Sequence, residues 1–429
     1  MTTSTPQRVC VIGAGAAGLE AVRVFRDAGH DVVAFDRSER AGGHWHTDYE
    51  ALHLITPRDV SCFDGVPMPA SYPLFPSREQ VIAYLDAFAA DHDLLAHIRF
   101  GTEVTAVTSP DGGVSGWDVT TAAGTEHFDA VVVANGHHWD ARLPAMAADF
   151  TGRSLHSSQY RSVADVEGRR VLVVGAGNSG CDLAVDAANA RLEVSIAMRH
   201  GQVFQPKTFF GRGRNQLPLL AKLPPWAAER VQRALVRVSV GSPSDYPGLQ
   251  EPVTRNLNEQ APVVNDLLLY WLQHGRITAR TGVVGVAGRE VSFADGTSAE
   301  FDTVLWATGF AVSLPFLAPD QLTWSAGAPL RVGGMTVPVG TARMYTVGLA
   351  SPRGAQFPVF SAQSALAVRL LGLEGRTARP LDVELLAAGA PDDRVDVLRP
   401  VWSQQMTRSH QVLDGLPTNP ARTLQESTR

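Results

Sequence analysis

The order of apolar and polar positions near the start of the chain predicts a strand, a turn, a helix and a second strand. Residues 8–12 (RVCVI) form a short apolar run, and residues 31–35 (DVVAF) form another. Between them lie a glycine-rich turn and a stretch with helical spacing over residues 19–28. An apolar run of this length is typical of a buried parallel strand. The pattern therefore predicts a βαβ unit.

The same pattern occurs again more than 150 residues later. Residues 170–174 form an apolar run, residues 181–190 have helical spacing, and residues 193–197 form a second apolar run. A glycine-rich turn again joins the first run to the helix. The sequence therefore predicts a second βαβ unit of the same design.

Further apolar runs set the expected domain plan. Residues 128–135 and 301–307 each read as a buried strand that ends in a glycine-containing turn. We expect an α/β protein with two Rossmann-like dinucleotide-binding domains, the second inserted in the first. The expected boundaries are 1–165 for the first part of the first domain and 166–296 for the second domain, with a helical insertion at about 208–258. Residues 297–429 then complete the first domain and form a C-terminal tail.

The two glycine-rich turns have the chemistry of phosphate binding. The first glycine permits a tight turn, the second lets a pyrophosphate approach the backbone, and the third lets helix and strand pack closely. The free N–H groups of a helix N-terminus then face the anion. We call residues 13–18 the first cradle and residues 175–180 the second cradle. Their candidate cofactor-binding residues are Gly13, Gly15, Ala16 and Gly18 in the first, and Gly175, Gly177, Asn178, Ser179 and Gly180 in the second.

The residues after each second strand distinguish the two ligands. Asp36, followed by Arg37, stands where an acid hydrogen-bonds the ribose of an adenosine. In the second unit Arg199 and His200 occupy this place, and a guanidinium suits the 2′-phosphate of NADPH. We therefore expect FAD on the first cradle and NADPH on the second. A solvated strand-end charge is the alternative for Arg199, and Lys207 is an alternative phosphate contact.

Composition excludes several other classes of function. The net charge is −6 and the pI is about 6.1, which argues against nucleic-acid and membrane partners. The three cysteines are far apart, and His137-His138 has no carboxylate or cysteine beside it, so no metal is expected. Without a signal-like or membrane-spanning stretch, the expected location is cytoplasmic. The charges at Arg212, Arg214 and Lys222 predict a solvated face.

Several motifs resemble those of the flavin-containing monooxygenases, a family of class B flavoprotein monooxygenases, and most of all its short bacterial members. Residues 150–160 (FTGRSLHSSQY) match the family pattern FxGxxxHxxxY, and residues 42–45 (GGHW) resemble its flavin-contact motif GGxW. Residues 135–137 and 307–310 resemble its paired domain-crossing turns. The resemblance adds these candidate cofactor-binding residues: Gly43, Trp45, Thr56, Arg58, Ala307, Thr308, Gly309, Gly348 and Gln363.

The resemblance implies a monooxygenase mechanism. NADPH reduces FAD, O2 adds at flavin C4a, and the resulting (hydro)peroxide oxygenates nitrogen or sulfur of a small organic substrate. Where animal-type members have an asparagine near the flavin, this chain has Ile55, which cannot donate a side-chain hydrogen bond. Thr56 is therefore the candidate catalytic residue.

Two other functions remain open on the same fold. One is Baeyer–Villiger ketone oxygenation or oxidative decarboxylation, although Tyr160 stands where the Baeyer–Villiger relatives have tryptophan. The other is a non-catalytic flavoprotein redox sensor. A homodimer is compatible with the sequence.

Overall fold

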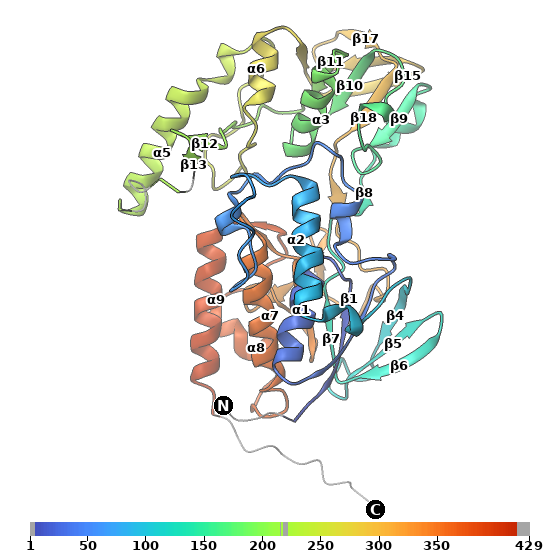
Figure 1. Ribbon diagram of the computed structural model, residues 1–429, viewed down its shortest axis with the longest axis vertical. Helices are drawn as coiled ribbons and strands as arrows, with labels where there is room; N and C mark the ends of the chain where they lie inside the picture. Colours follow the sequence, from blue (N-terminus) through green and yellow to red (C-terminus); the bar gives the residue numbers. More distant parts are fainter. Residues whose placement is uncertain (1–4, 215, 218–221, 418–429) are drawn as a thin grey trace, which may run out of the picture.

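The computed structural model describes residues 5–214, 216–217 and 222–417. It has two lobes, each built on a five-stranded parallel sheet (Figure 1). The sheet of the first lobe has the order β24-β7-β1-β2-β3, and that of the second has the order β14-β11-β10-β18-β9. The strands of the first sheet are β1 (Arg8–Ile12), β2 (Asp31–Phe35), β3 (Ile98–Arg99), β7 (Ala130–Val133) and β24 (Met344–Thr346). Those of the second are β9 (Arg153–His156), β10 (Arg170–Val174), β11 (Glu193–Ala197), β14 (Ile277–Arg280) and β18 (Thr303–Trp306).

The two βαβ units that the sequence predicts are present. In the first, α1 (Ala16–Asp27) joins β1 to β2, and in the second, α3 (Asn178–Asn189) joins β10 to β11. Each first strand lies in the centre of its sheet and is apolar after its first residue, an arginine, because both of its faces are covered. Val9 and Val11 face the helical side of the first sheet, and Cys10 faces the other side.

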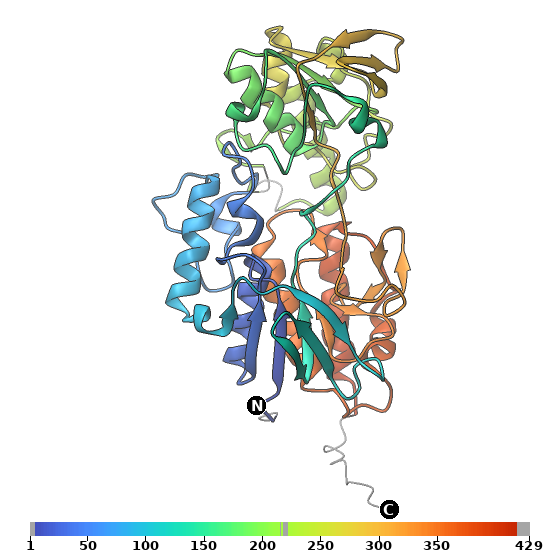
Figure 2. The same ribbon diagram turned by 90° about the vertical axis from the view of Figure 1, so that its right-hand side faces the viewer.

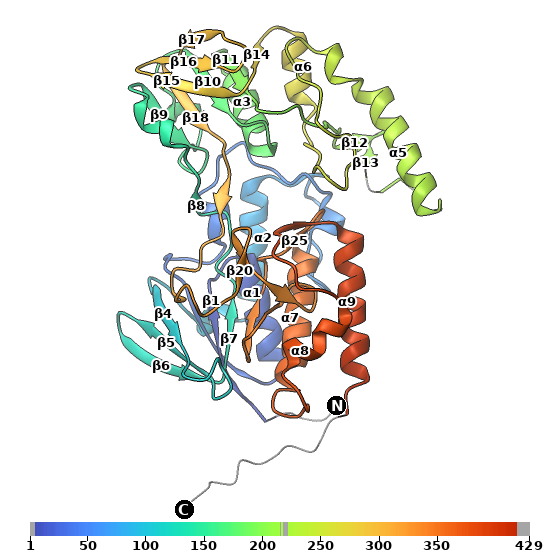
Figure 3. The same cartoon turned by 180° about the vertical axis from the view of Figure 1, so that it is seen from behind.

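A small antiparallel sheet covers the second face of each large sheet. In the first lobe it consists of β4 (Val104–Thr108), β5 (Trp117–Thr121) and β6 (Gly124–Phe128). In the second it consists of β15 (Val283–Ala287), β16 (Glu290–Phe293) and β17 (Ser298–Glu300). Figures 1 and 3 show these sheets on the outer sides of the two lobes.

Helices from distant parts of the chain cover the first lobe. In Figure 1 the blue α1 lies beside the red and orange C-terminal helices, and α1 packs directly on α7. The helices of this lobe besides α1 are α2 (Arg78–Asp91), α7 (Phe357–Leu371), α8 (Leu381–Leu385) and α9 (Arg399–Asp414). Within the described residues, no helix is both long and apolar enough to cross a membrane.

The second sheet extends beyond the range 166–296 expected for the second domain. Strand β9 precedes this range and β18 follows it, yet both pair within the second sheet. The chain re-enters the first lobe after β18, where Leu314 and Phe316 pack in its core, slightly later than the expected boundary at 297. Strand β24 then completes the first sheet. An apolar strand carries no local signal of the sheet that it joins, so the boundaries drawn from the sequence are too narrow on both sides.

The expected insertion at 208–258 is only partly helical. It contains α5 (Pro225–Val240) and a short hairpin of β12 (Thr208–Phe209) and β13 (Arg212–Gly213). Helix α6 (Leu267–Gln273) follows it and packs on α3. In Figure 1 α5 projects from the second lobe, with the hairpin near the level at which the two lobes meet.

Candidate functional site

The first and third glycines of both cradles are required by the packing of the protein itself. Gly13 has φ +103°, and a Cβ there would lie 2.6 Å from the Ala134 carbonyl oxygen. A Cβ on Gly18 would lie 1.8 Å from the Gly13 carbonyl oxygen. The second cradle repeats this geometry. Gly175 has φ +110°, and a Cβ there would lie 2.3 Å from the Ala307 carbonyl oxygen. A Cβ on Gly180 would lie 1.9 Å from the Gly175 carbonyl oxygen.

The middle glycines are different, because nothing in the protein excludes a side chain there. A Cβ on Gly177 would meet no atom within 4 Å, and a Cβ on Gly15 would meet only the Gly43 Cα at 3.7 Å. Their φ values, −74° and −70°, suit any residue. Each middle glycine is the N-cap of a helix that has no side-chain cap and no acid in its first turn. The residues of both cradles therefore fit a dinucleotide pyrophosphate, which needs this open backbone.

Two later segments of the chain close over the first cradle. The Gly42 N–H donates to the Ala14 carbonyl at 2.9 Å, and a Cβ on Gly43 would lie 3.0 Å from the Gly15 Cα. Gly348 lies over the start of α1, because a Cβ added to Gly348 would be 2.9 Å from the Ala17 Cβ.

Trp45 and Gln363 support this cover. Trp45 is buried and stacks on His44 with ring centroids 5.3 Å apart. The buried Gln363 carbonyl Oε1 accepts from the Gly348 N–H at 2.9 Å. The structure thus brings Gly43, Trp45, Gly348 and Gln363 together at the first cradle, although they are separated by about 300 residues of sequence.

Asp36 lies against the first cradle. Its Oδ2 accepts from the Ala14 N–H at 2.5 Å, and its Oδ1 accepts from the Ser38 N–H at 2.7 Å. The neighbouring Arg37 points elsewhere, with its guanidinium carbon 4.6 Å from the Trp139 ring centroid. The acid is therefore positioned at the strand end, as ribose binding requires.

Only one of the two candidate phosphate cations lies at the end of the second strand. Arg199 is exposed, follows β11 directly and has no ion pair within the described residues. His200 beside it is also exposed. Lys207 lies instead where the lobes meet, with its Nζ on His53 Nε2 of the first lobe. Burial lowers the pKa of Lys207, while Asp182 and Asp266 oppose this shift.

The second cradle helix is fastened to the first lobe through Tyr49. The Tyr49 hydroxyl donates to Asp182 Oδ2 at 2.9 Å. The Asn178 side-chain oxygen accepts from the Val264 N–H at 2.8 Å. The side chain of Asn178 thus makes a contact within the protein, which the turn pattern did not predict.

Two chain crossings connect the lobes, and they lie side by side (Figure 2). Strand β8 (Asp140–Ala141) pairs antiparallel with β19 (Phe310–Ala311). The Arg142 N–H donates to the Gly309 carbonyl at 2.9 Å, and the Thr308 hydroxyl donates to the Arg142 carbonyl. Thr308 and Gly309 therefore belong to this crossing, whereas Ala307 packs on Gly175 and Gly180.

His156 of the FxGxxxHxxxY motif holds the crossing in place. It is buried, and its Nε2 lies 3.0 Å from the Gly309 carbonyl, to which it must donate. Its Nδ1 then accepts from the Ser158 N–H at 3.2 Å. Burial lowers the pKa of His156. Both ring nitrogens are engaged within the protein, so His156 fastens the crossing and neither nitrogen is free for acid–base chemistry.

Thr56 and Arg58 lie on a loop of the first lobe. The Thr56 hydroxyl is buried and lies 2.7 Å from the Ser61 hydroxyl. Arg58 donates to the carbonyls of Ala70 and Tyr72 and pairs with Asp59 at 2.9 Å. Both side chains are therefore engaged inside this loop, and their contact with a cofactor stays a prediction.

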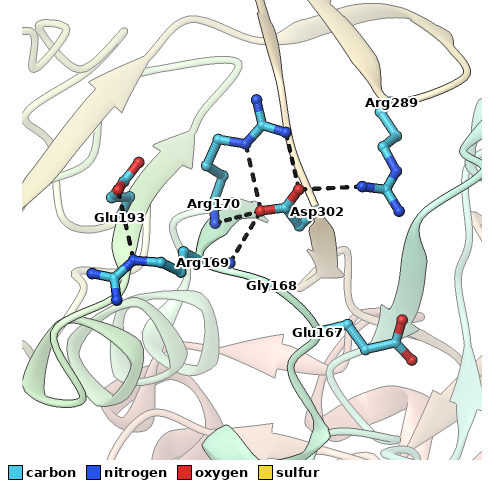
Figure 4. A pocket seen from close by; sticks show the side chains of 7 residues that line it. All are labelled: Glu167, Gly168, Arg169, Arg170, Glu193, Arg289 and Asp302. Atoms are coloured by element: carbon cyan, nitrogen blue, oxygen red, sulfur yellow. Dashed lines mark hydrogen bonds and ion pairs between the residues drawn. The ribbon is translucent and has the colours of Figure 1, made fainter.

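A charged depression of about 520 Å³ lies at the opposite end of the second sheet (Figure 4). Asp302 accepts there from the backbone N–H groups of Arg169 and Arg170, at 3.0 Å each. The Arg170 guanidinium holds the pKa of Asp302 well below its usual range. Because α/β sheets bind ligands at the carboxyl ends of their strands, this depression at the amino ends is a structural ion cluster.

Two glycine-rich cradles on parallel sheets define a protein of the two-dinucleotide class. The profile of the flavin-binding monooxygenase-like family matches residues 6–388, and the chain belongs to this family, whose members use FAD and NADPH. Rat "dimethylaniline monooxygenase [N-oxide-forming] 2" is 31% identical over 93% of this chain and 79% of its own length.

Solved structures share the fold. A flavin-containing monooxygenase from Stenotrophomonas maltophilia matches with a TM-score of 0.66 and 24% identity, over 85% of this chain and 98% of the other. Cyclohexanone-bound cyclohexanone monooxygenase matches with a TM-score of 0.72 and 17% identity, over 97% and 99%. Both kinds of oxygenase thus have this architecture, so the fold does not choose between their reactions.

Proposed function

We propose that this protein is an NADPH- and O2-dependent monooxygenase that adds one oxygen atom to a nitrogen or sulfur atom of a small organic molecule. One substrate, one NADPH, one proton and one O2 give one oxide, one NADP⁺ and one water. The observation that carries the proposal is the pair of open middle glycines, Gly15 and Gly177, on uncapped helix N-termini. Two such sites in one chain suit two dinucleotides better than one.

The assignment of the cofactors rests on the strand ends. We assign FAD to the first cradle, where Asp36 lies at the strand end, and NADPH to the second, where Arg199 is an exposed cation. A bound FAD supplies the redox chemistry, and the chain's own residues position it and exclude water from it. The domain plan that follows is a nucleotide-binding unit for FAD interrupted by one for NADPH.

Thr56 keeps its proposed role because Ile55 offers no side-chain hydrogen-bond donor on this loop. The Ser61 hydroxyl donates to the Pro57 carbonyl at 2.9 Å, so the Thr56 hydroxyl donates to Ser61 Oγ at 2.7 Å. To serve a ligand, the Thr56 hydroxyl would have to turn away from Ser61.

The test is a direct measurement of stoichiometry. Purified protein should be yellow, NADPH should bleach its flavin absorbance anaerobically, and NADPH should do so faster than NADH. In air, a panel of amines and sulfides should give products heavier by one oxygen atom, with one NADPH consumed per product. Turnover of ketones to esters instead would favour the Baeyer–Villiger alternative, and failure to bleach would favour the redox sensor.

A further inference from the structure

The hairpin of β12 and β13 belongs to the second lobe but rests on the first. A Cβ on Gly213 would lie 2.4 Å from the Pro57 Cγ, and Lys207 at the start of the hairpin lies on His53. Arg214 directly follows β13, and its N–H donates to the Lys207 carbonyl at 3.1 Å. Its backbone is thus fixed between the lobes, beside the loop that carries Thr56.

The side chain of Arg214 is not part of the solvated face that the sequence predicts. Its Nη1 is inaccessible to solvent and unpartnered, and within the described residues the side chain makes no hydrogen bond, ion pair or ring contact. Arg212, two residues earlier, is exposed. Other arginines with a buried unpartnered nitrogen do have partners: the guanidinium of Arg331, for example, donates to the carbonyls of Pro329 and Arg394.

Burial lowers the pKa of Arg214 to about 10, and no carboxylate opposes this shift. At neutral pH the guanidinium is therefore still charged. A buried charge without a counter-ion is costly to the folded protein. Such a cost is typical of groups that are arranged to meet a ligand.

Two cations flank Arg214 in the same hairpin segment. Arg212 lies two residues earlier, and the Lys207 carbonyl accepts from the Arg214 backbone N–H. The nearby acids Asp182 and Asp266 act on Lys207, and neither affects the pKa of Arg214. A planar guanidinium binds a carboxylate through two parallel hydrogen bonds.

We propose that Arg214 binds a carboxylate group of the substrate, so that the preferred substrates are small amines or sulfides that also carry a carboxylate. This inference rests on the proposed monooxygenase function and names its substrate class. The NADPH phosphate is the other anion at hand, but Arg199 already stands at the strand end where that phosphate is expected.

The test compares two matched sulfides, (methylthio)acetate and (methylthio)acetamide, in three proteins. The wild-type protein should prefer the carboxylate by about 10- to 100-fold in kcat/KM, the usual effect of a charge-assisted pair. Arg214→Gln should abolish this preference and leave the amide and the NADPH KM unchanged. Arg212→Gln, in the same hairpin, should behave like wild type.

Two further measurements keep folding and function separate. Calorimetric binding of the two sulfides to the flavin-loaded protein without NADPH needs no oxygenation, so a carboxylate preference there supports the site even if turnover fails. Thermal unfolding of Arg214→Gln should match or exceed wild type, because a charge without a partner is removed. Equal binding of both sulfides by wild type, or a raised NADPH KM without a change in preference, overturns the proposal.

Discussion

The two cradles have the same turn, the same uncapped helix and the same packing of their outer glycines, but their surroundings differ. Later parts of the chain cover the first: the residue 42–45 turn lies on Gly15, and Gly348 lies on Ala17. Gly177 of the second has no protein atom within 4 Å of its Cβ position, and Arg199 at the strand end is exposed.

This difference matches two modes of cofactor use. A cofactor that stays bound through many turnovers gains from a site closed by several segments, because each contact slows its dissociation. A hydride donor must enter and leave in each cycle, which an open site permits. The covered cradle thus suits a resident flavin, and the open cradle suits a nicotinamide nucleotide that exchanges.

The largest effect is expected from a branched side chain at a middle glycine. Gly15→Val should yield a folded but colourless protein, because the side chain occupies the pyrophosphate position under the residue 42–45 turn. Gly177→Val should remain yellow, yet NADPH should no longer bleach it. Absorbance measures the flavin content, and stopped flow measures the anaerobic reduction by NADPH. A yellow Gly15→Val protein would show that the first cradle does not hold the flavin.

A smaller effect is expected at the end of the second strand. Arg199→Ala should raise the KM for NADPH by about 10- to 100-fold, because it removes a charge-assisted contact to the 2′-phosphate. The KM for NADH should hardly change, since NADH lacks this phosphate. Arg169→Ala, an exposed arginine at the opposite end of the second sheet, serves as the control. If the KM values for NADPH and NADH rose equally, Arg199 would hold the strand end in place rather than bind the 2′-phosphate.

The smallest effect concerns the crossing that joins the two units. His156→Ala should cost about 2 kcal/mol of stability at neutral pH, through its lost hydrogen bonds and burial. The lowered pKa means that folding favours the neutral ring, so this contribution is present above the unfolded pKa of about 6.5 and is lost as the pH falls below it.

Melting temperatures between pH 7.5 and about 5 measure this contribution. The wild-type protein should lose stability on acidification, and His156→Ala should lose less. The exposed His127, changed to Ala, is the control and should follow wild type. Identical acid slopes for wild type and His156→Ala would mean that folding does not shift the pKa of His156.

Local pattern was enough to predict the two βαβ units and Asp36 and Arg199 at the strand ends, because strand, turn and helix signals there are contiguous in sequence. It did not indicate that β9 and β18 join the second sheet. Residues 301–307 look like residues 128–135 because both are buried strands, and the choice of sheet depends on contacts with β10 and β1 respectively, which lie far away in the chain.

The individual side chains of the second lobe were harder to predict. Lys207 lies only ten residues after β11, but the intervening turn carries it to His53 of the other lobe. Arg212 and Arg214 are identical residues two positions apart, yet Arg212 is exposed and Arg214 is partly buried with an inaccessible Nη1. Period-two alternation would place both on one face of a strand, but β13 ends at Gly213, and the pattern did not indicate that end.

The paired strands β8 and β19 mean that the second lobe leaves and rejoins the first at a single point, where the Arg142 N–H meets the Gly309 carbonyl. Segments whose ends lie together can be exchanged without stretching the host, as in domain insertion. Residues 142–309 can therefore be exchanged as one unit. Replacing them with the same segment of a relative should change the coenzyme preference and leave the proposed flavin-binding lobe unchanged.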